Sequence, residues 1–136
     1  MDHYLPIQVL ESRFAVCRLA ADAPEPDWAR AGELLAIIRT REELSLVCEE
    51  RFVPPEVKAE RGWRAFQIQG PLDFALTGVL ESVARPLTEA AVSLFALSTY
   101  DTDFFLVKQG AFDRALAALE QAGHQILNAN LRHSTE

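Results

Sequence analysis

Residues 63–83, WRAFQIQGPLDFALTGVLESV, change from a strand pattern to a helix pattern across a single turn. Trp63–Gln69 alternates apolar and polar residues, which predicts a β-strand. Gly70-Pro71-Leu72-Asp73 is a turn that leads into a helix, because apolar residues then recur at intervals of three and four. These apolar residues are Phe74, Leu76, Val79, Leu80 and Val83. We expect Pro86 to end this helix, since proline removes a helical hydrogen bond.

The segment that follows supplies the remaining elements of one small domain. Val92–Leu97 and Phe104–Val107 read as strands around a polar connection. Gly110 precedes a second amphipathic helix that ends at the C-cap signal Ala122-Gly123, and a last strand begins at Ile126. This order, βαββαβ, is the ferredoxin-like plan, so we expect an antiparallel sheet with both helices on one face.

The N-terminal half is rich in strands. Leu5–Leu10 and Phe14–Leu19 are β-rich runs, and the polar residues 11–13 between them indicate either a tight hairpin or a kink. Two further strands are predicted at Leu34–Ile38 and Leu44–Cys48. The helical signals are short by comparison, because Asp27 could cap a helix only as far as Ala31, and Pro54-Pro55 could start one or two turns.

An internal repeat relates the two halves. After a displacement of 60 residues, Leu34–Val47 falls on Leu94–Val107 with the same strand–turn–strand pattern, and acidic Glu43 falls on Asp103. The upstream strands match at a displacement of only about 51 residues, so the first copy has a shorter crossover. We therefore predict an α+β protein of two tandem ferredoxin-like units, the first degenerate, at residues 1–61 and 62–131, with a tail at 132–136.

Composition limits the classes of function. The chain has 136 residues, of which 49% are apolar, and this is enough for a packed interior. Its net charge of −7 and pI near 5.0 argue against nucleic acid or an anionic membrane surface as a partner. No apolar run approaches the roughly 18 residues that a membrane span needs, and the N-terminus lacks the pattern of a signal peptide. We expect a cytoplasmic protein.

The residues that could carry out chemistry form no catalytic or metal motif. Cys17 and Cys48 each lie in an apolar alternating run and are expected to be buried free thiols, while no histidine has a partner at metal-ligand spacing. We interpret His124 as a cation at a helix end. Asp101 and Asp103 could in principle form an acid–base pair, but we favour a polar, solvent-facing turn as their explanation. The sequence therefore predicts no catalysis, no metal and no cofactor.

Three motifs together resemble a known family: Gly70-Pro71-Leu72-Asp73-Phe74, then Gly78, and then Ser98-Thr99-Tyr100-Asp101-Thr102-Asp103-Phe104 followed by Leu106-Val107. The chain is similar to the tandem ACT-domain proteins related to CASTOR-type arginine sensors, and more distantly to the regulatory ACT domains of aspartate kinases. The resemblance implies a regulatory module that binds a free amino acid where ACT units pair side by side. It also implies a homodimer and a regulated enzyme or other protein partner.

The resemblance also implies which residues bind the ligand, and Ser93 and Leu94 match the strand on the partner side. Matched position by position, they are Gly70, Asp73, Leu76, Val79, Ser93, Leu94, Thr99, Tyr100, Thr102 and Asp103. The physical chemistry agrees, because N–H groups at the start of a helix suit an α-carboxylate and the Asp103 carboxylate suits an α-ammonium. Structural alternatives remain, since Asp73 could simply cap the helix and Asp103 could simply be a hairpin acid. Thr99 and Tyr100 could be ordinary strand-end residues.

One departure from the arginine sensors affects specificity. Those proteins carry a glutamate at the position of Leu76, where it meets the guanidinium. An apolar residue there predicts a neutral amino acid, aliphatic or small and polar, as the ligand. The alternative function is a protein-interaction module in which the ACT pair dimerises or docks on an enzyme and binds no ligand.

Overall fold

The computed structural model describes residues 4–69 and 78–128, and the chain divides into two compact units. Residues 12–63 form one, which we call the N-terminal unit. Residues 1–11 join 64–136 in the other, the C-terminal unit. Two long strands, β1 (Pro6–Leu19) and β4 (Ala59–Ile68), contribute residues to both units.

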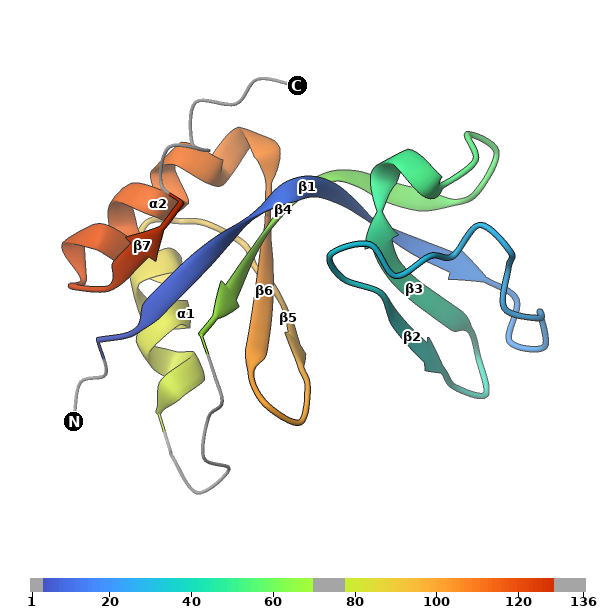
Figure 1. Ribbon diagram of the computed structural model, residues 1–136, viewed down its shortest axis with the longest axis horizontal. Coiled ribbons are helices and arrows are strands. Elements are labelled where there is room, and N and C mark those ends of the chain that lie inside the picture. The colour runs from blue at the N-terminus through green and yellow to red at the C-terminus, as the bar shows by residue number, and fades with distance from the viewer. Residues whose placement is uncertain (1–3, 70–77, 129–136) are drawn as a thin grey trace. The chain divides into compact units, whose positions relative to one another are not determined.

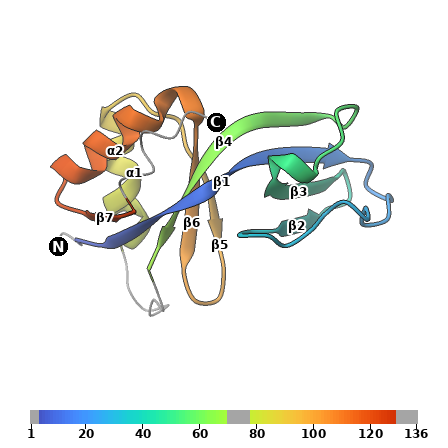
Figure 2. The same ribbon diagram turned by 45° about the horizontal axis from the view of Figure 1, so that its top comes forward.

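The C-terminal unit is a mixed α/β fold whose elements follow the predicted βαββαβ order. After β4 come α1 (Val79–Glu89), β5 (Phe95–Ser98), β6 (Asp103–Lys108), α2 (Phe112–Gln121) and β7 (Gln125–Leu127). The strand order in this unit is β1-β4-β6-β5, and β7 pairs in parallel with the start of β1. The first residues of β1 therefore lie between β4 and β7, and both helices pack on one face of the sheet (Figures 1 and 2).

The core of the C-terminal unit lies between that sheet and the two helices. Phe66 of β4 stacks on Phe105 of β6 and on Phe112 of α2, with ring centroids 4.9 and 5.6 Å apart. Residues two apart on the strands and three or four apart on the helices supply the other buried side chains. Each large apolar side chain buried in this way contributes about 1.5–3 kcal/mol to the stability of the fold. The alternating pattern that predicted the strands therefore also determines which face of the sheet the helices cover.

Helix α1 begins at Val79, after Gly78 in the left-handed conformation (φ 78°), while the predicted helix start near Asp73 lies outside the described residues. The C-terminal end of α1 differs from its prediction. Pro86 lies inside α1, which continues to Glu89, so the expectation that Pro86 ends the helix was wrong. Proline leaves the carbonyl of Ser82 without its helical donor, but His124 Nε2 lies 2.8 Å from that oxygen and replaces the donor.

In the N-terminal unit, β2 (Ala36–Arg39) and β3 (Leu44–Glu49) were predicted correctly, and the strand order is β2-β3-β1-β4. Strand β1 is continuous through residues 11–13, so the hairpin alternative at that point was wrong. β7 pairs with Pro6–Gln8 of β1 and β3 pairs with Phe14–Leu19, while β4 is the neighbour of β1 on its other side, so one strand serves both units.

The short helices predicted for the N-terminal unit are not formed, and residues 12–63, all described, contain no α-helix. Residues 20–35 contain neither helix nor strand, and the Ala29 N–H bonds only the Pro26 carbonyl in a single turn. A 3₁₀ helix, η1 (Glu50–Phe52), precedes Pro54 and stops at Val53 in an extended conformation. Its counterpart in the C-terminal unit, η2 (Gln109–Ala111), continues directly into α2 at Phe112. In the N-terminal unit, Pro54 and Pro55 follow η1 at the corresponding place, and proline does not donate the hydrogen bonds that a helix needs.

The β2–β3 and β5–β6 hairpins have the same register. Ala36 lies opposite Val47 in one, and Phe95 lies opposite Leu106 in the other. A displacement of 59 residues along the chain relates the first residue pair to the second, and it also relates η1 to η2. This displacement is one residue shorter than the 60 residues found from the sequence.

Candidate functional site

The turn between β5 and β6 carries four of the residues predicted to bind a ligand, and its hydrogen bonds close it on itself. The Thr99 N–H donates to the Thr102 carbonyl over 2.8 Å. The Thr99 hydroxyl lies 3.1 Å from both the amide nitrogen and the carbonyl oxygen of Thr102, so it can accept from one and donate to the other. Such bonds from a threonine hydroxyl to the backbone stabilise tight turns and hold their residues in one geometry.

Thr102 fastens this turn to the neighbouring strand. Its side chain is buried, and its hydroxyl donates to the carbonyl of Ile68, the last residue of β4. Ile68 comes two residues before Gly70 in the chain. The turn is therefore held beside the point from which the chain leaves the sheet toward the predicted carboxylate-binding segment.

Asp103 begins β6 with its carboxylate partly exposed. Its Oδ1 accepts a hydrogen bond from the Ser98 hydroxyl at 2.6 Å, across the strand pair that joins these two residues. Among the described residues, nothing else forms a side-chain hydrogen bond or ion pair with this carboxylate. Tyr100 extends from the tip of the turn with 81% of its surface exposed. The arrangement offers an oriented, accessible carboxylate to a cationic group.

The other predicted residues are distributed differently. The Val79 side chain is 7% exposed and belongs to the core, so it faces the sheet. Ser93 and Leu94 precede β5, at the opposite end of the hairpin from the turn, so within one chain they do not meet Asp103. Three predicted site residues lie outside the described residues: Gly70, Asp73 and Leu76.

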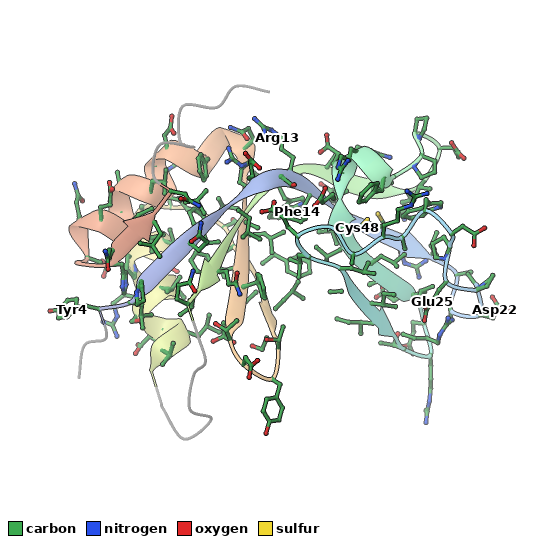
Figure 3. All side chains as sticks on the ribbon, in the orientation of Figure 1. Tyr4, Arg13, Phe14, Asp22, Glu25 and Cys48 are labelled. Atoms are coloured by element: carbon green, nitrogen blue, oxygen red, sulfur yellow. The ribbon has the colours of Figure 1, made fainter. Side chains whose placement is uncertain are left out.

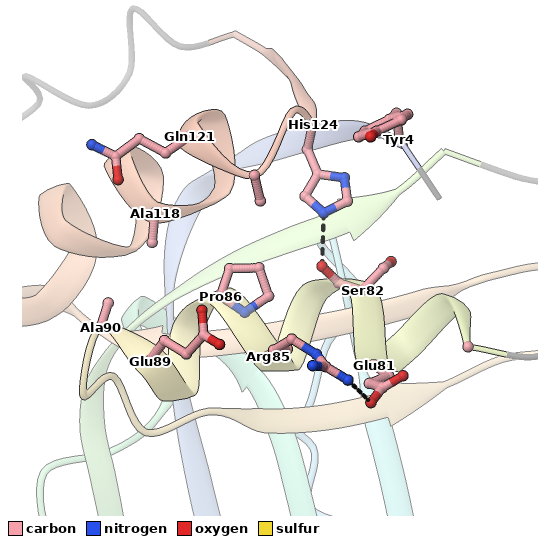
Figure 4. A pocket seen from close by; sticks show the side chains of 12 residues that line it. Tyr4, Glu81, Ser82, Arg85, Pro86, Glu89, Ala90, Ala118, Gln121 and His124 are labelled. Atoms are coloured by element: carbon pink, nitrogen blue, oxygen red, sulfur yellow. Dashed lines mark hydrogen bonds and ion pairs between the residues drawn. The ribbon is translucent and has the colours of Figure 1, made fainter. Parts of the chain in front are cut away.

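A groove of about 650 Å³ separates α1 from α2 in the C-terminal unit, and the predicted site residues do not line it (Figure 4). Arg85 and Glu81 on its wall pair with each other at 2.5 Å. Buried His124 accepts a hydrogen bond from the Leu5 N–H at Nδ1 (3.1 Å). Its Nε2 must then carry the proton that bonds Ser82, which makes the ring neutral and the helix-end cation interpretation wrong. Because these polar groups already bond one another, the β5–β6 turn is the better candidate site.

Sequence reasoning missed a buried carboxylate in the N-terminal unit. Glu49 is 2% exposed; its Oε2 accepts from the Glu33 N–H at 2.7 Å and its Oε1 accepts from Arg51 Nε at 2.7 Å. Burial opposes ionisation, but the bonds from Arg51, the Glu33 N–H and Ser12 outweigh it and hold the pKa of Glu49 below its ordinary value. A Cβ on Gly32 would lie 2.2 Å from Oε2, so Gly32 and Glu49 fit only together. Nothing in the sequence separates Glu49 from the exposed acids near it.

Two further observations concern the described residues. Neither α1 nor α2 has the length and apolar character that crossing a membrane requires. No group of three or more histidine, cysteine or acidic side chains within residues 4–69 and 78–128 is arranged to hold a metal ion.

Comparison with known families finds two matches that together span most of the chain. The model of the ACT domain matches residues 58–121. A second model, that of an N-terminal domain, matches residues 12–56. None of the curated proteins that were compared resembles the chain.

Solved structures resemble the chain over nearly its whole length. A protein of Agobacterium tumefaciens is 34% identical with a TM-score of 0.87, over 93% of this chain and 94% of that one. A Vibrio cholerae protein of unknown function, described as a possible transport protein, is 18% identical with a TM-score of 0.72, covering 88% and 90%. The ligand-free regulatory subunit of aspartate kinase from Thermus thermophilus is 11% identical with a TM-score of 0.57, covering 85% and 95%. The similarity to the Vibrio cholerae and Thermus thermophilus proteins shows a shared fold only.

Proposed function

Because this chain belongs to the same family as the Agobacterium tumefaciens protein and matches the ACT domain over residues 58–121, we propose that it is a regulatory module that binds a free amino acid and catalyses no reaction. The fold that it shares with a regulatory subunit of aspartate kinase supports a regulatory role. We place this activity in the cytoplasm.

The observation that carries this proposal is the fastening of the β5–β6 turn to β4. The buried Thr102 hydroxyl bonds the Ile68 carbonyl, and the adjacent Asp103 carboxylate is left partly exposed. A preorganised carboxylate binds an ammonium group at a lower entropic cost than a mobile one. A turn that served only to connect two strands would not need a buried anchor beside an accessible acid.

We further propose that the N-terminal unit is a degenerate ACT-like unit without α-helices. Its β2–β3 turn is built as the β5–β6 turn is, because the Thr40 N–H donates to the Glu43 carbonyl (2.9 Å) and the Glu43 N–H donates to the Thr40 hydroxyl (3.2 Å). Among the described strands, β2 and β5 lie at the two ends of the strand order. Such edges favour pairing, which supports a homodimer with the ligand at an ACT–ACT interface.

The ligand is expected to be a neutral amino acid. Its α-carboxylate would meet N–H groups of the segment that begins at Gly70 and of the first turn of α1, and its α-ammonium would meet Asp103. Leu76 would contact its side chain. A guanidinium placed against Leu76 would lose water without gaining a partner, at a cost of several kcal/mol.

A thermal-shift screen of the purified protein against the twenty amino acids tests this function. At a ligand concentration of about 100 times Kd, stabilisation reaches about 2.7 kcal/mol, which raises the melting temperature by several degrees in a protein of this size. We expect one or a few neutral amino acids to produce this shift. No shift with any amino acid at millimolar concentration would refute the sensor function.

One observation favours the alternative, a docking module that binds no ligand. Tyr100 at the turn and Ile38 on β2 are large apolar side chains that are 81% and 50% exposed. Exposed side chains of this kind occur at protein interfaces. If the amino acid screen is negative and a Tyr100→Ser variant loses a partner that the wild-type protein retains, the docking function replaces the sensor function.

A further inference from the structure

Cys17 and Cys48 are neighbours on one face of the N-terminal unit. In the antiparallel β1–β3 pair, Ala15 lies opposite Cys48 and Cys17 lies opposite Leu46. Side chains two residues apart point to the same face, so these four residues share it, and all four belong to one buried cluster. The two cysteines are therefore diagonal neighbours, and each thiol shifts the pKa of the other (Cys48 is marked in Figure 3).

The environment gives the two thiols different roles. The hydrogen bond that Cys48 donates lowers the pKa of Cys17, against the effect of burial, and the positive charge of Arg61 adds to the lowering. The same bond raises the pKa of Cys48, and burial and the nearby Glu49 carboxylate act in the same direction. Cys17 is thus the nucleophilic sulfur and Cys48 is the thiol that holds a proton beside it.

We propose that Cys17 and Cys48 form a reversible intramolecular disulfide when the protein meets a peroxide. The Cys17 thiolate attacks one peroxide oxygen, the O–O bond breaks, and Cys17 becomes a sulfenic acid while hydroxide leaves. The Cys48 sulfur then attacks the Cys17 sulfur, the S–OH bond breaks, and the thiol proton leaves with the hydroxyl group as water. Two thiols are oxidised by two electrons and one peroxide is reduced.

Access to these buried sulfurs depends on the irregular segment 20–35. Trp28, Ala29 and Leu35 of this segment pack against the cysteine cluster. Chain without regular secondary structure opens locally at a smaller free-energy cost than a packed helix does. The segment is fastened near its end by the bond from the Glu33 N–H to Glu49, the residue that follows Cys48. Opening of this segment admits a molecule as small as hydrogen peroxide without unfolding the strands.

The test treats the full chain with hydrogen peroxide under native conditions, blocks remaining thiols with an alkylating reagent, and identifies the products by mass spectrometry. We expect the monomer to lose two hydrogen atoms and to yield a linked peptide that contains Cys17 and Cys48, which dithiothreitol reverses. A Gly32→Ala variant, whose new methyl group would collide with Glu49, should react severalfold faster.

Single substitutions distinguish the two sulfurs. In Cys48→Ser, Cys17 has no resolving thiol and should accumulate a sulfenic acid that dimedone traps, whereas Cys48 in Cys17→Ser should stay reduced. Full alkylation of both thiols after peroxide treatment of the native wild-type chain would overturn the proposal. So would a linkage that forms only in urea, because it would then belong to the unfolded chain. The wild-type experiment decides the matter even if a variant does not fold.

Discussion

His124 Nε2 donates a hydrogen bond of 2.8 Å to the Ser82 carbonyl, the oxygen that Pro86 leaves without a donor inside α1. Nδ1 of the same ring accepts from the Leu5 N–H next to β1. A single neutral imidazole thus supplies the hydrogen-bond donor that Pro86 lacks, and it connects α1 to the N-terminal strand of the sheet.

This relationship predicts energetic coupling between His124 and Pro86. His124→Ala should lower the free energy of unfolding by about 1–3 kcal/mol, because the buried Leu5 N–H and the partly buried Ser82 carbonyl lose their partner. In a Pro86→Ala background the new N–H can bond the Ser82 carbonyl, so the same change should cost about 0.5–1.5 kcal/mol less. Urea unfolding of the four proteins measures the difference, and additive effects would show that the proline is not what His124 compensates.

The buried Glu49 predicts a dependence of stability on pH. Its pKa in the folded protein is below the ordinary value, so its stabilisation is fully present above the unfolded pKa of roughly 4.3 and is lost as the pH falls through the folded value. Glu49→Gln should lower the free energy of unfolding at pH 7 by about 1–3 kcal/mol. It should also make the free energy of unfolding fall less steeply as the pH is lowered. The exposed residue Glu25, changed to glutamine, serves as the control. Identical acid profiles for wild type and Glu49→Gln would contradict the assignment.

Thr102 should position the candidate site through its hydroxyl. Thr102→Val keeps the shape of the side chain but removes the donor to Ile68, leaving a buried carbonyl unpaired at a cost of about 1–3 kcal/mol. Thr102→Ser keeps the donor and should retain most of the stability. We also expect only the valine variant to bind the amino acid more weakly, as titration calorimetry would reveal. Equal behaviour of the two variants would show that the hydroxyl is not needed.

The strands in the interior of the strand order were predicted best from the sequence. The strand assignments around Trp63–Gln69 and Leu44–Cys48 were correct because both segments carry runs of buried β-forming side chains. Helix ends were predicted less well, because they depended on distant partners. Only the fold brings His124 to the Ser82 carbonyl, and no local rule reveals that Pro86 can be accommodated.

The candidate site could be predicted only as a turn. The string Ser98–Asp103 identified a polar connection, and the structure shows how Thr99 and Thr102 close it. Glu49 was missed because its importance depends on Gly32 and Glu33, which approach it from a loop without a repeating pattern. The closeness of the two cysteines was missed because it depends on the register between β1 and β3.

The position of β2 and β5 at the ends of the described strand order predicts self-association. Analytical ultracentrifugation at tens of micromolar should show a dimer or a larger species. Charged substitutions on an edge strand, such as Ala96→Lys on β5 or Ile38→Lys on β2, should weaken it. A single species of 15.2 kDa across that concentration range would contradict an interface between copies.

The most direct test of the sensor function compares two acids of the same turn by titration calorimetry with the amino acid that the screen identifies. Asp103→Asn removes the charge expected to meet the α-ammonium, while Asp101→Asn changes an exposed neighbour two residues away and serves as the matched control. A charge-assisted hydrogen bond is worth roughly 1.5–3 kcal/mol, so Asp103→Asn should weaken binding about ten- to a hundredfold with an unchanged melting temperature of the free protein. Asp101→Asn should bind as the wild type does. Equal affinities in all three proteins would contradict the account.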